Sequence, residues 1–284
     1  MTAIRPLEPG DEGAVRQFLD NHADSSMFLR SNLAAAGLAD GADAYQGRWV
    51  AAFLGEAIVG ITAHFWNGML AVQAPLAAEA LAAAVDGLLP LREIVGMTGP
   101  LDQVMRVREA LGLTLRPPRF FGREELFGCD LAEMTEPPAA AGLRVRPPRL
   151  DELPLLIEWR VAYHIEAYNA EPSDGLLAAS SEEITLRHGE AHDFILVDDG
   201  DRPLAYCAYN AVLPDRVQIG GVYTPPEQRG HGHARRVVAG SMAEAARRGA
   251  VRAVLFTGTG NQPARRAYFS LGFRILGDWG LVLV

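Results

Sequence analysis

The chain repeats one pattern of expected strands and helices in its two halves. In the first half, Thr98-Gly99 precedes an expected helix that ends in Leu111-Gly112-Leu113. In the second half, Thr257-Gly258 precedes an expected helix that ends in Leu271-Gly272-Phe273. Self-similarity of this kind predicts that one structural unit occurs twice. Because strands and helices alternate in each copy, the expected fold class is α/β, with a mixed α+β sheet in each half.

Apolar periodicity predicts the elements of each half. In the first half we expect helices at 11–21, 25–36, 76–88 and 102–111 and strands at 49–54, 57–65, 69–73, 92–97 and 120–131. In the second half we expect helices at 151–168, 181–188, from about 234, and 261–271, strands at 194–197, 204–210, 216–224 and 251–256, and a last pair of strands within 273–284.

Length and composition agree with two domains. The 284 residues exceed the usual domain size of roughly 100 to 150 residues, and 49% of them are hydrophobic, which suffices for packed cores. The halves begin alike, with Ile4-Arg5-Pro6 and Val145-Arg146-Pro147. Between them, residues 134–142 contain Pro137-Pro138 and no periodic pattern. We therefore expect one domain at 1–134, a linker at 135–142 and a second domain at 143–284.

Charge and cysteine usage restrict the setting and the partners. The net charge of -9 argues against nucleic acid or an anionic membrane as the principal partner. The two cysteines, Cys129 and Cys207, lack C-x-x-C spacing and indicate a reducing compartment. The N-terminus has no signal-peptide pattern, and the most apolar helix is too short to cross a bilayer. We expect a soluble, cytoplasmic protein that binds neither nucleic acid nor membrane.

A glycine-containing loop in the second half predicts an anion site. Residues 216–224 indicate a strand, Pro225 and Pro226 end it, and a helix follows from about Ala234. Gly230 and Gly232 therefore lie where a strand leads into the first turn of a helix, whose unpaired amides favour phosphate. A tight turn without a ligand is the alternative for such a loop taken alone.

The first half lacks such a loop. There the strand that ends at Gln73-Ala74 continues into Pro75, with no glycine, and Glu79 would repel an anion. If the glycine loop binds phosphate, we expect only the second copy to do so.

Two histidine pairs and an acidic turn were weighed as metal sites. His231 and His233 lie within the glycine loop, and His188 and His192 lie around a helix end. The acidic turn at 198–201 lacks the closing Glu of a calcium loop and favours a hairpin turn. We expect no metal.

The second half resembles the GNAT superfamily of N-acyltransferases over residues 143–284. Arg229 to Ala234 are similar to the family's [RQ]-x-x-G-x-[GA] loop. Asn261 to Phe269, with Asn261, Ala264 and Tyr268 at matching positions, followed by Leu271-Gly272-Phe273, resemble its N-x-x-A-x-x-x-Y helix and closing L-G-F. The resemblance implies tandem GNAT-like folds and acetyl-CoA as the acyl donor.

The resemblance also implies roles for individual residues. The donor would contact Val222, Tyr223, Thr224, Arg229, Gly230, His231, Gly232, His233, Ala234, Arg235, Asn261, Ala264 and Tyr268. The backbone at 222–224 would pair with the pantetheine arm, and the amides at 229–234 would hold the pyrophosphate. Asn261 would bond the pantetheine or acyl end, and Arg235 or Arg236 would reach the adenosine 3'-phosphate unless they lie on a solvated helix face.

Tyr268 is expected as the general acid for the thiolate, and packing on an amphipathic helix is its alternative role. A thiolate of pKa near 8.5 and a tyrosine of pKa near 10 make this transfer uphill by roughly 2 kcal/mol, so Tyr268 should help without being indispensable. Glu166, beside Tyr163, His164 and Tyr168, is the candidate general base, directly or through water. A solvated helical Glu is its alternative role.

These expectations define an N-acetyltransferase that transfers acetyl from acetyl-CoA to a primary amine by direct attack on the thioester. The first half would be a degenerate copy that no longer binds CoA. The alternatives are a CoA-binding sensor without turnover, or another tandem transferase of the thiol-biosynthesis or aminoacyl type. The sequence holds no motif that identifies the amine, the acyl preference or the oligomeric state.

Overall fold

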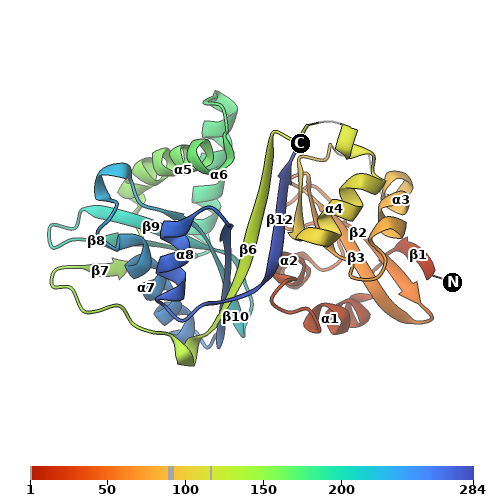
Figure 1. The fold of residues 1–284 in the computed structure, drawn as a ribbon, viewed down its shortest axis with the longest axis horizontal. Coiled ribbons are helices and arrows are strands. Elements are labelled where there is room, and N and C mark those ends of the chain that lie inside the picture. Colours follow the sequence, from red (N-terminus) through yellow and green to blue (C-terminus); the bar gives the residue numbers. More distant parts are fainter. Residues whose placement is uncertain (1, 89–92, 116) are drawn as a thin grey trace. The chain divides into compact units, whose positions relative to one another are not determined.

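The computed structural model describes residues 2–88, 93–115 and 117–284 (Figure 1). By their contacts the residues divide into two compact units. Unit 1 comprises Met1–Leu126 and Leu276–Val284, and unit 2 comprises Phe127–Ile275. The chain thus passes from one unit to the other within two strands, so these units differ from the expected domains at residues 127–134 and 276–284.

Unit 1 is a sheet with helices on both faces. Its strands follow the order β1-β2-β3-β4-β5-β12-β6, in which β4 and β5 are parallel and the pairs from β1 to β4 are antiparallel. The strands are β1 (Thr2–Pro6), β2 (Gly47–Leu54), β3 (Ala57–Phe65), β4 (Met69–Gln73), β5 (Gly96–Pro100), β6 (Phe120–Asp130) and β12 (Arg274–Leu283). The helices are α1 (Glu12–Asp20), α2 (Met27–Ala36), α3 (Ala78–Leu88) and α4 (Leu101–Ala110).

The alternation of side chains along β2 explains why helices cover both faces of this sheet. Trp49 and Phe53 pack with the apolar residues of α1 and α2, whereas Val50 and Ala52 pack with those of α3 and α4. Every second side chain of a strand points to the same face, so a strand that is apolar throughout needs cover on both.

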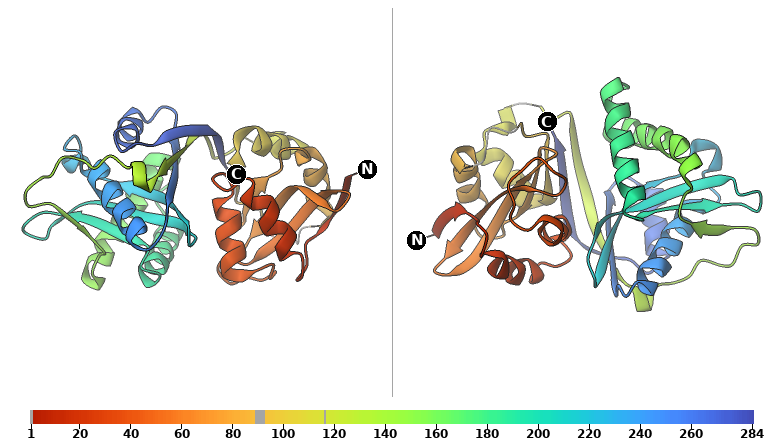
Figure 2. Two further views of the ribbon diagram at one scale, coloured as in Figure 1. Left: turned by 90° about the horizontal axis from the view of Figure 1, so that it is seen from below. Right: turned by 180° about the vertical axis from the view of Figure 1, so that it is seen from behind.

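Unit 2 repeats this arrangement. Its strands follow the order β6-β11-β10-β9-β8-β7, and β10 and β11 are parallel. The elements are β7 (Arg144–Arg146), α5 (Leu153–Tyr168), α6 (Asp174–Gly189), β8 (Asp193–Val197), β9 (Pro203–Val212), β10 (Arg216–Tyr223), α7 (His233–Arg247), β11 (Arg252–Gly258) and α8 (Gln262–Phe269). Helices α5 and α6 cover one face, and α7 and α8 cover the other (Figures 1 and 2).

The internal duplication is confirmed by the order of elements and by one side-chain motif. In unit 1, Arg5 donates to the Pro6 carbonyl at 3.0 Å and pairs with Asp11 at 2.7 Å. In unit 2, Arg146 donates to the Pro147 carbonyl at 3.0 Å and pairs with Glu152 at 2.7 Å. The same spacing therefore joins the first strand of each unit to the start of its first long helix.

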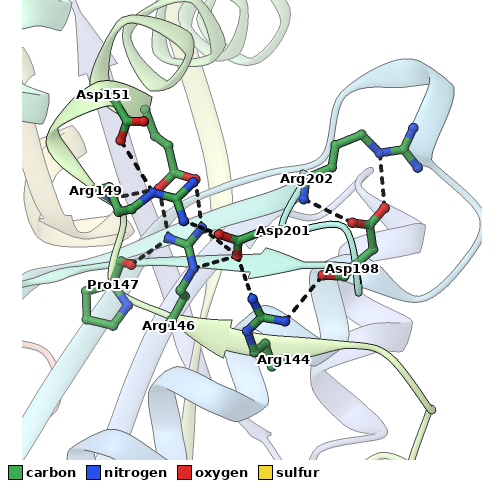
Figure 3. A network of polar contacts seen from close by, with 9 residues as sticks. Arg144, Arg146, Pro147, Arg149, Asp151, Asp198, Asp201 and Arg202 are labelled. Carbon is green, nitrogen blue, oxygen red and sulfur yellow. Dashed lines mark hydrogen bonds and ion pairs between the residues drawn. The ribbon is translucent and has the colours of Figure 1, made fainter.

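In unit 2 this motif belongs to a larger polar network (Figure 3). Asp201, in the turn between β8 and β9, accepts from Arg144 at 2.7 Å and from Arg146 at 2.9 Å and also pairs with Arg149. These guanidiniums lower the pKa of Asp201 to about 2. The network ties β7 and the segment before α5 to the β8–β9 turn, so it fixes where α5 begins.

Three expected elements differ from the structure. The helix expected at 181–188 begins at Asp174, where the Ser173 side chain caps it by accepting from the Leu176 amide at 3.1 Å. The pair of strands expected within 273–284 is the single strand β12. The strand expected at 92–97 is β5 at Gly96–Pro100, and Arg92 lies outside the described residues. Among the described helices, none is long and apolar enough to cross a membrane.

Candidate active site

The parallel strands β10 and β11 pair only at their beginnings. Arg216, Val217 and Gln218 of β10 pair in register with residues 252–254 of β11. Beyond Gln218, β10 continues to Tyr223 and β11 to Gly258. In the described part of the chain, these later residues have no partner across the β10–β11 pair. Their backbone N–H and C=O groups on the facing edges are therefore available to hydrogen-bond an extended ligand between the two strands.

A bulge interrupts β10 on its other side. Its pairing with β9 shifts register between Gly220, opposite Ala208, and Tyr223, opposite Tyr206. Gly221 within this shift has φ of +60°, a left-handed conformation that glycine adopts without strain. The bulge thus turns the backbone of 221–223 out of the regular ladder.

The loop after β10 presents a run of free backbone amides. Gly230 and Gly232 have φ of +83° and +75°, and Gly232 is the N-cap of α7 without a side-chain cap. No acceptor within the described residues receives a hydrogen bond from the amides of 230–235, whereas the Arg236 amide bonds the Gly232 carbonyl at 3.2 Å. A Cβ at Gly230 would meet nothing within 4 Å. Free donors at a helix N-terminus favour an anion.

The two arginines of the first turn of α7 differ. Arg235 makes no hydrogen bond or ion pair in the part of the chain that is described, and its Nη2 lies 3.9 Å from the point that a Cβ on Gly232 would occupy. Arg236 donates to the Pro138 carbonyl at 2.6 Å. Arg235 is therefore the cation that remains available beside the free amides.

The two loop histidines stack on each other. The rings of His231 and His233 lie 5.6 Å apart with an interplanar angle of 21°. Burial, with His231 and Arg236 nearby, lowers the pKa of His233. His188 contacts Asp193 at 3.3 Å and His192 contacts Glu190 at 3.0 Å. Within the described ranges, no three His, Cys, Asp or Glu side chains gather as a metal site would need.

Glu166 on α5 contacts the loop directly. Its Oε2 accepts from Arg229 Nη2 at 2.6 Å, and its Oε1 accepts from the Tyr223 hydroxyl at 3.3 Å. Arg229 also donates to the Thr224 carbonyl at 2.9 Å. Burial, followed by the Glu166 charge, raises the pKa of Tyr223. The candidate base and the candidate donor loop thus form one connected set.

Helix α8 carries the remaining candidates. The Asn261 side-chain oxygen accepts from the Ala264 amide at 3.2 Å and so caps the helix. Tyr268 is buried, and its ring lies 6.0 Å from the rings of Phe127 and Phe273. Ala264 packs at the edge of the same core.

The corresponding positions in unit 1 are occupied by protein. Strands β4 and β5 also pair over only three positions, from Met69 to Ala71. The amide of Ala74, directly after β4, donates to the Gln103 side chain of α4 at 2.6 Å. Arg106, also on α4, donates to the Pro75 carbonyl at 3.4 Å. Side chains of α4 thus bond two backbone groups that follow β4, the Ala74 amide and the Pro75 carbonyl.

Sequence reasoning missed a polar cluster that side chains of α5 and α6 form. Arg160 of α5 and Arg187 of α6 both bond Glu183, at 2.8 Å and 3.1 Å, while His164 Nε2 lies 3.7 Å from Glu183. Arg187 also donates to the Tyr209 carbonyl. These cations lower the pKa of Glu183. The i,i+4 spacing of Glu183 and Arg187 within the helix expected at 181–188 was a visible signal, but Arg160 is distant in sequence.

Comparisons with known proteins agree with this geometry. Residues 153–273 match the family model of the acetyltransferase (GNAT) family. No curated protein matches the chain. The chain is similar to a GCN5-related N-acetyltransferase from Sphaerobacter thermophilus, with a TM-score of 0.60 at 16% identity over 99% of this chain and 94% of that one.

A tandem GNAT protein from the clavulanic acid biosynthesis pathway gives a TM-score of 0.58 at 14% identity over 100% of this chain and 98% of that one. An acetyltransferase from Colwellia psychrerythraea gives a TM-score of 0.53 at 14% identity over 99% of this chain and 100% of that one. At such identities the likeness concerns the fold, and the expected tandem GNAT-like fold is confirmed.

Proposed function

Because residues 153–273 form a domain of the GNAT acetyltransferase family, we propose that the chain is an N-acetyltransferase that transfers acetyl from acetyl-CoA to a primary amine. The observation that carries the proposal is the run of unbonded amides at 230–235, which begins α7 beside strands that no longer pair. A diphosphate supplies the acceptors that these amides lack.

The proposed donor site follows the order of the chain. The backbone of Val222, Tyr223 and Thr224 pairs with the pantetheine arm. The amides of the loop from Arg229 to Ala234 hold the pyrophosphate, and Arg235 adds a positive charge beside them. Asn261 and Ala264 at the start of α8 border the arm. His231 and His233 line the loop without a metal role.

The proposed reaction is a direct transfer. The amine nitrogen bonds to the acetyl carbonyl carbon, the carbon–sulfur bond breaks, and the thiolate takes a proton to leave as CoA. A Lys-like amine of pKa near 10.4 costs about 4.6 kcal/mol to deprotonate at pH 7. Glu166, directly or through water, takes this proton. Each of its oxygens accepts one bond, from Arg229 or from Tyr223, and keeps a further lone pair for this proton.

Tyr268 is the proposed acid for the departing thiolate. It lies on α8, the helix that follows β11, and its ring is held by Phe127 and Phe273. A side chain held in this way needs no reordering when the thiolate forms, which favours transfer.

Unit 1 is proposed to support the transferase without binding a second donor. The Gln103 bond to the Ala74 amide and the Arg106 bond to the Pro75 carbonyl occupy the groups that a CoA would need. The proposal places this enzyme in the cytoplasm and assigns it neither nucleic acid nor membrane as a partner.

The function is tested by thiol release from acetyl-CoA in the presence of a panel of primary amines, with acetylated product identified by mass. The proposal predicts amine-dependent release of CoA and the matching product. Acetyl-CoA binding without turnover on any amine would instead indicate a CoA-binding sensor.

A further inference from the structure

In the polar cluster that side chains of α5 and α6 form, one donor of Arg160 lies at the bulge of β10 without a hydrogen-bond partner among the described residues. Arg160 Nε and Nη2 form a two-pronged pair with Glu183, both at 2.8 Å. Its third nitrogen, Nη1, lies 3.0 Å from the point that a Cβ on Gly221 would occupy. Within the described residues Nη1 makes no hydrogen bond. One edge of the guanidinium is therefore saturated, and the other is directed at the bulge.

A second unused group lies beside it. The Cε1 atom of Tyr206, on β9, is 3.7 Å from the same point above Gly221. Tyr206 is 3% exposed, and its hydroxyl has no hydrogen-bond partner among the described residues. A hydroxyl buried in this way is destabilising unless something bonds it. Burial also raises the pKa of Tyr206, so the hydroxyl keeps its proton and can donate.

The charges around the bulge favour an anion there. Arg160 and Arg187 share the single carboxylate of Glu183. Two other carboxylates lie nearby, and each has a cationic or imidazole neighbour: Glu166 pairs with Arg229 at 2.6 Å, and Asp193 contacts His188 at 3.3 Å. The guanidinium of Arg160 is thus only partly neutralised on its Glu183 side. The free nitrogen of Arg160 and the hydroxyl of Tyr206, whose ring lies near the same point above Gly221, offer two donors for the two oxygens of a carboxylate.

We propose that the amine acceptor also carries a carboxylate, which Arg160 Nη1 and the Tyr206 hydroxyl bind beside Gly221. The inference rests on the proposed acetyltransferase function and names its substrate class. The carboxylate does not react. The amine nitrogen gains the acetyl group, the thioester carbon–sulfur bond breaks, and the amine proton ends on the CoA thiol.

The test compares acceptors that differ only in this group. Free α-amino acids, ω-amino acids and dipeptides are paired with their carboxamides, and acetyl-CoA turnover and calorimetric binding to the CoA-loaded protein are measured for each. The inference predicts kcat/KM at least about tenfold higher for the carboxylates, as a charge-assisted hydrogen bond implies. Equal or better use of the carboxamides overturns it while leaving the acetyltransferase intact.

If neither member of any pair is acetylated, the proposed function fails for these amines, and calorimetry decides the inference. Tighter binding of the carboxylates to the full-length protein supports the carboxylate site, and equal binding of both members overturns it.

Two substitutions assign the preference to these residues. Tyr206→Phe removes only the unbonded hydroxyl, and Arg160→Lys keeps the charge but loses the fork. Both should raise KM for carboxylate acceptors about 3- to 30-fold, the cost of one lost hydrogen bond, with KM for carboxamides and acetyl-CoA unchanged. Tyr45→Phe in unit 1 is the matched control, and thermal unfolding checks that each variant folds. An equal loss with both acceptor types contradicts the assignment.

Discussion

Arg229 in the loop after β10 lies 2.6 Å from the carboxylate of Glu166 on α5. Both side chains are almost half exposed, at 48% and 44%, and such pairs contribute at most about 1 kcal/mol to stability. The pair is therefore weak enough to open. It connects the helix that covers the bulge of β10 with the loop that is proposed to hold the donor, which makes Glu166 the first residue to test.

Replacing Glu166 with Gln removes the proposed base and the partner of Arg229. We expect kcat/KM for the amine to fall about 100-fold, within the usual range for loss of a general base, and the pH–rate profile to change. Steady-state rates from pH 5.5 to 9 measure this. Glu158→Gln, at an exposed position on the same helix, should change neither. An unaltered pH–rate profile in Glu166→Gln excludes the base role.

Tyr268→Phe keeps the ring contacts with Phe127 and Phe273 and removes only the hydroxyl. Turnover should fall roughly 10- to 1000-fold, with little change in acetyl-CoA affinity, because the hydroxyl acts only as the thiolate departs. Single-turnover rates and calorimetric titration with acetyl-CoA separate the two effects. Turnover equal to that of the unmodified protein would mean that Tyr268 only packs.

Arg235→Ala removes the unpaired cation beside the loop amides. We expect the acetyl-CoA Kd to rise about tenfold, since one charged bond to phosphate contributes roughly 1.5 to 3 kcal/mol, and the rise should shrink at high salt. Arg247→Ala removes an arginine from the other end of α7, where it pairs with Glu244, and should leave the Kd unchanged. The same Kd in both variants contradicts a role for Arg235 in donor binding.

We predict that the free energy of unfolding depends on pH through Glu124 on β6. It is 7% exposed, its Oε2 has no hydrogen-bond partner among the described residues, and burial raises its pKa from 4.5 to about 7. Because the folded state favours the protonated form, this stabilisation is complete below pH 4.5 and is lost as the pH rises through 7. The shift corresponds to about 3 kcal/mol.

Urea titrations at pH 5 and pH 8 test this with Glu124→Gln. The decrease in unfolding free energy between the two pH values should be smaller by about 2 to 3 kcal/mol in the variant. Glu56→Gln, at the exposed β2–β3 turn, should retain the full decrease. A decrease of the same size in Glu124→Gln would show that another group titrates.

The fold could be predicted from the sequence where local pattern and tertiary structure agree. The repeated apolar runs and glycine turns predict two copies of one α/β unit, and the copies do share their element order. The helix that begins at Asp174 was placed too late because the apolar residues of its first turns do not recur at a clear helical spacing. The chain's passage between units within β12 could not be predicted, since Gly277-Asp278 favours a turn there and no local pattern indicates which unit each part joins.

Part of the candidate site could likewise be predicted from the sequence, and part of it could not. The glycine loop and the α8 motif are contiguous in sequence, so spacing reveals them. The pairing of Arg160 with Glu183, and the unbonded hydroxyl of Tyr206, depend on residues from α5, α6 and β9 that only the fold brings together. Charged residues on helices most often face solvent, so composition gave no reason to place Arg160 against the bulge of β10.

The central claim is that the amides at 230–235 hold the diphosphate of acetyl-CoA and direct its thioester along the unpaired ends of β10 and β11. A crystal structure of the complex with acetyl-CoA tests it most directly. The account predicts diphosphate oxygens within hydrogen-bond distance of these amides and the pantetheine arm beside Val222 and Thr224. A donor bound elsewhere, with the loop amides turned toward protein acceptors, would contradict it.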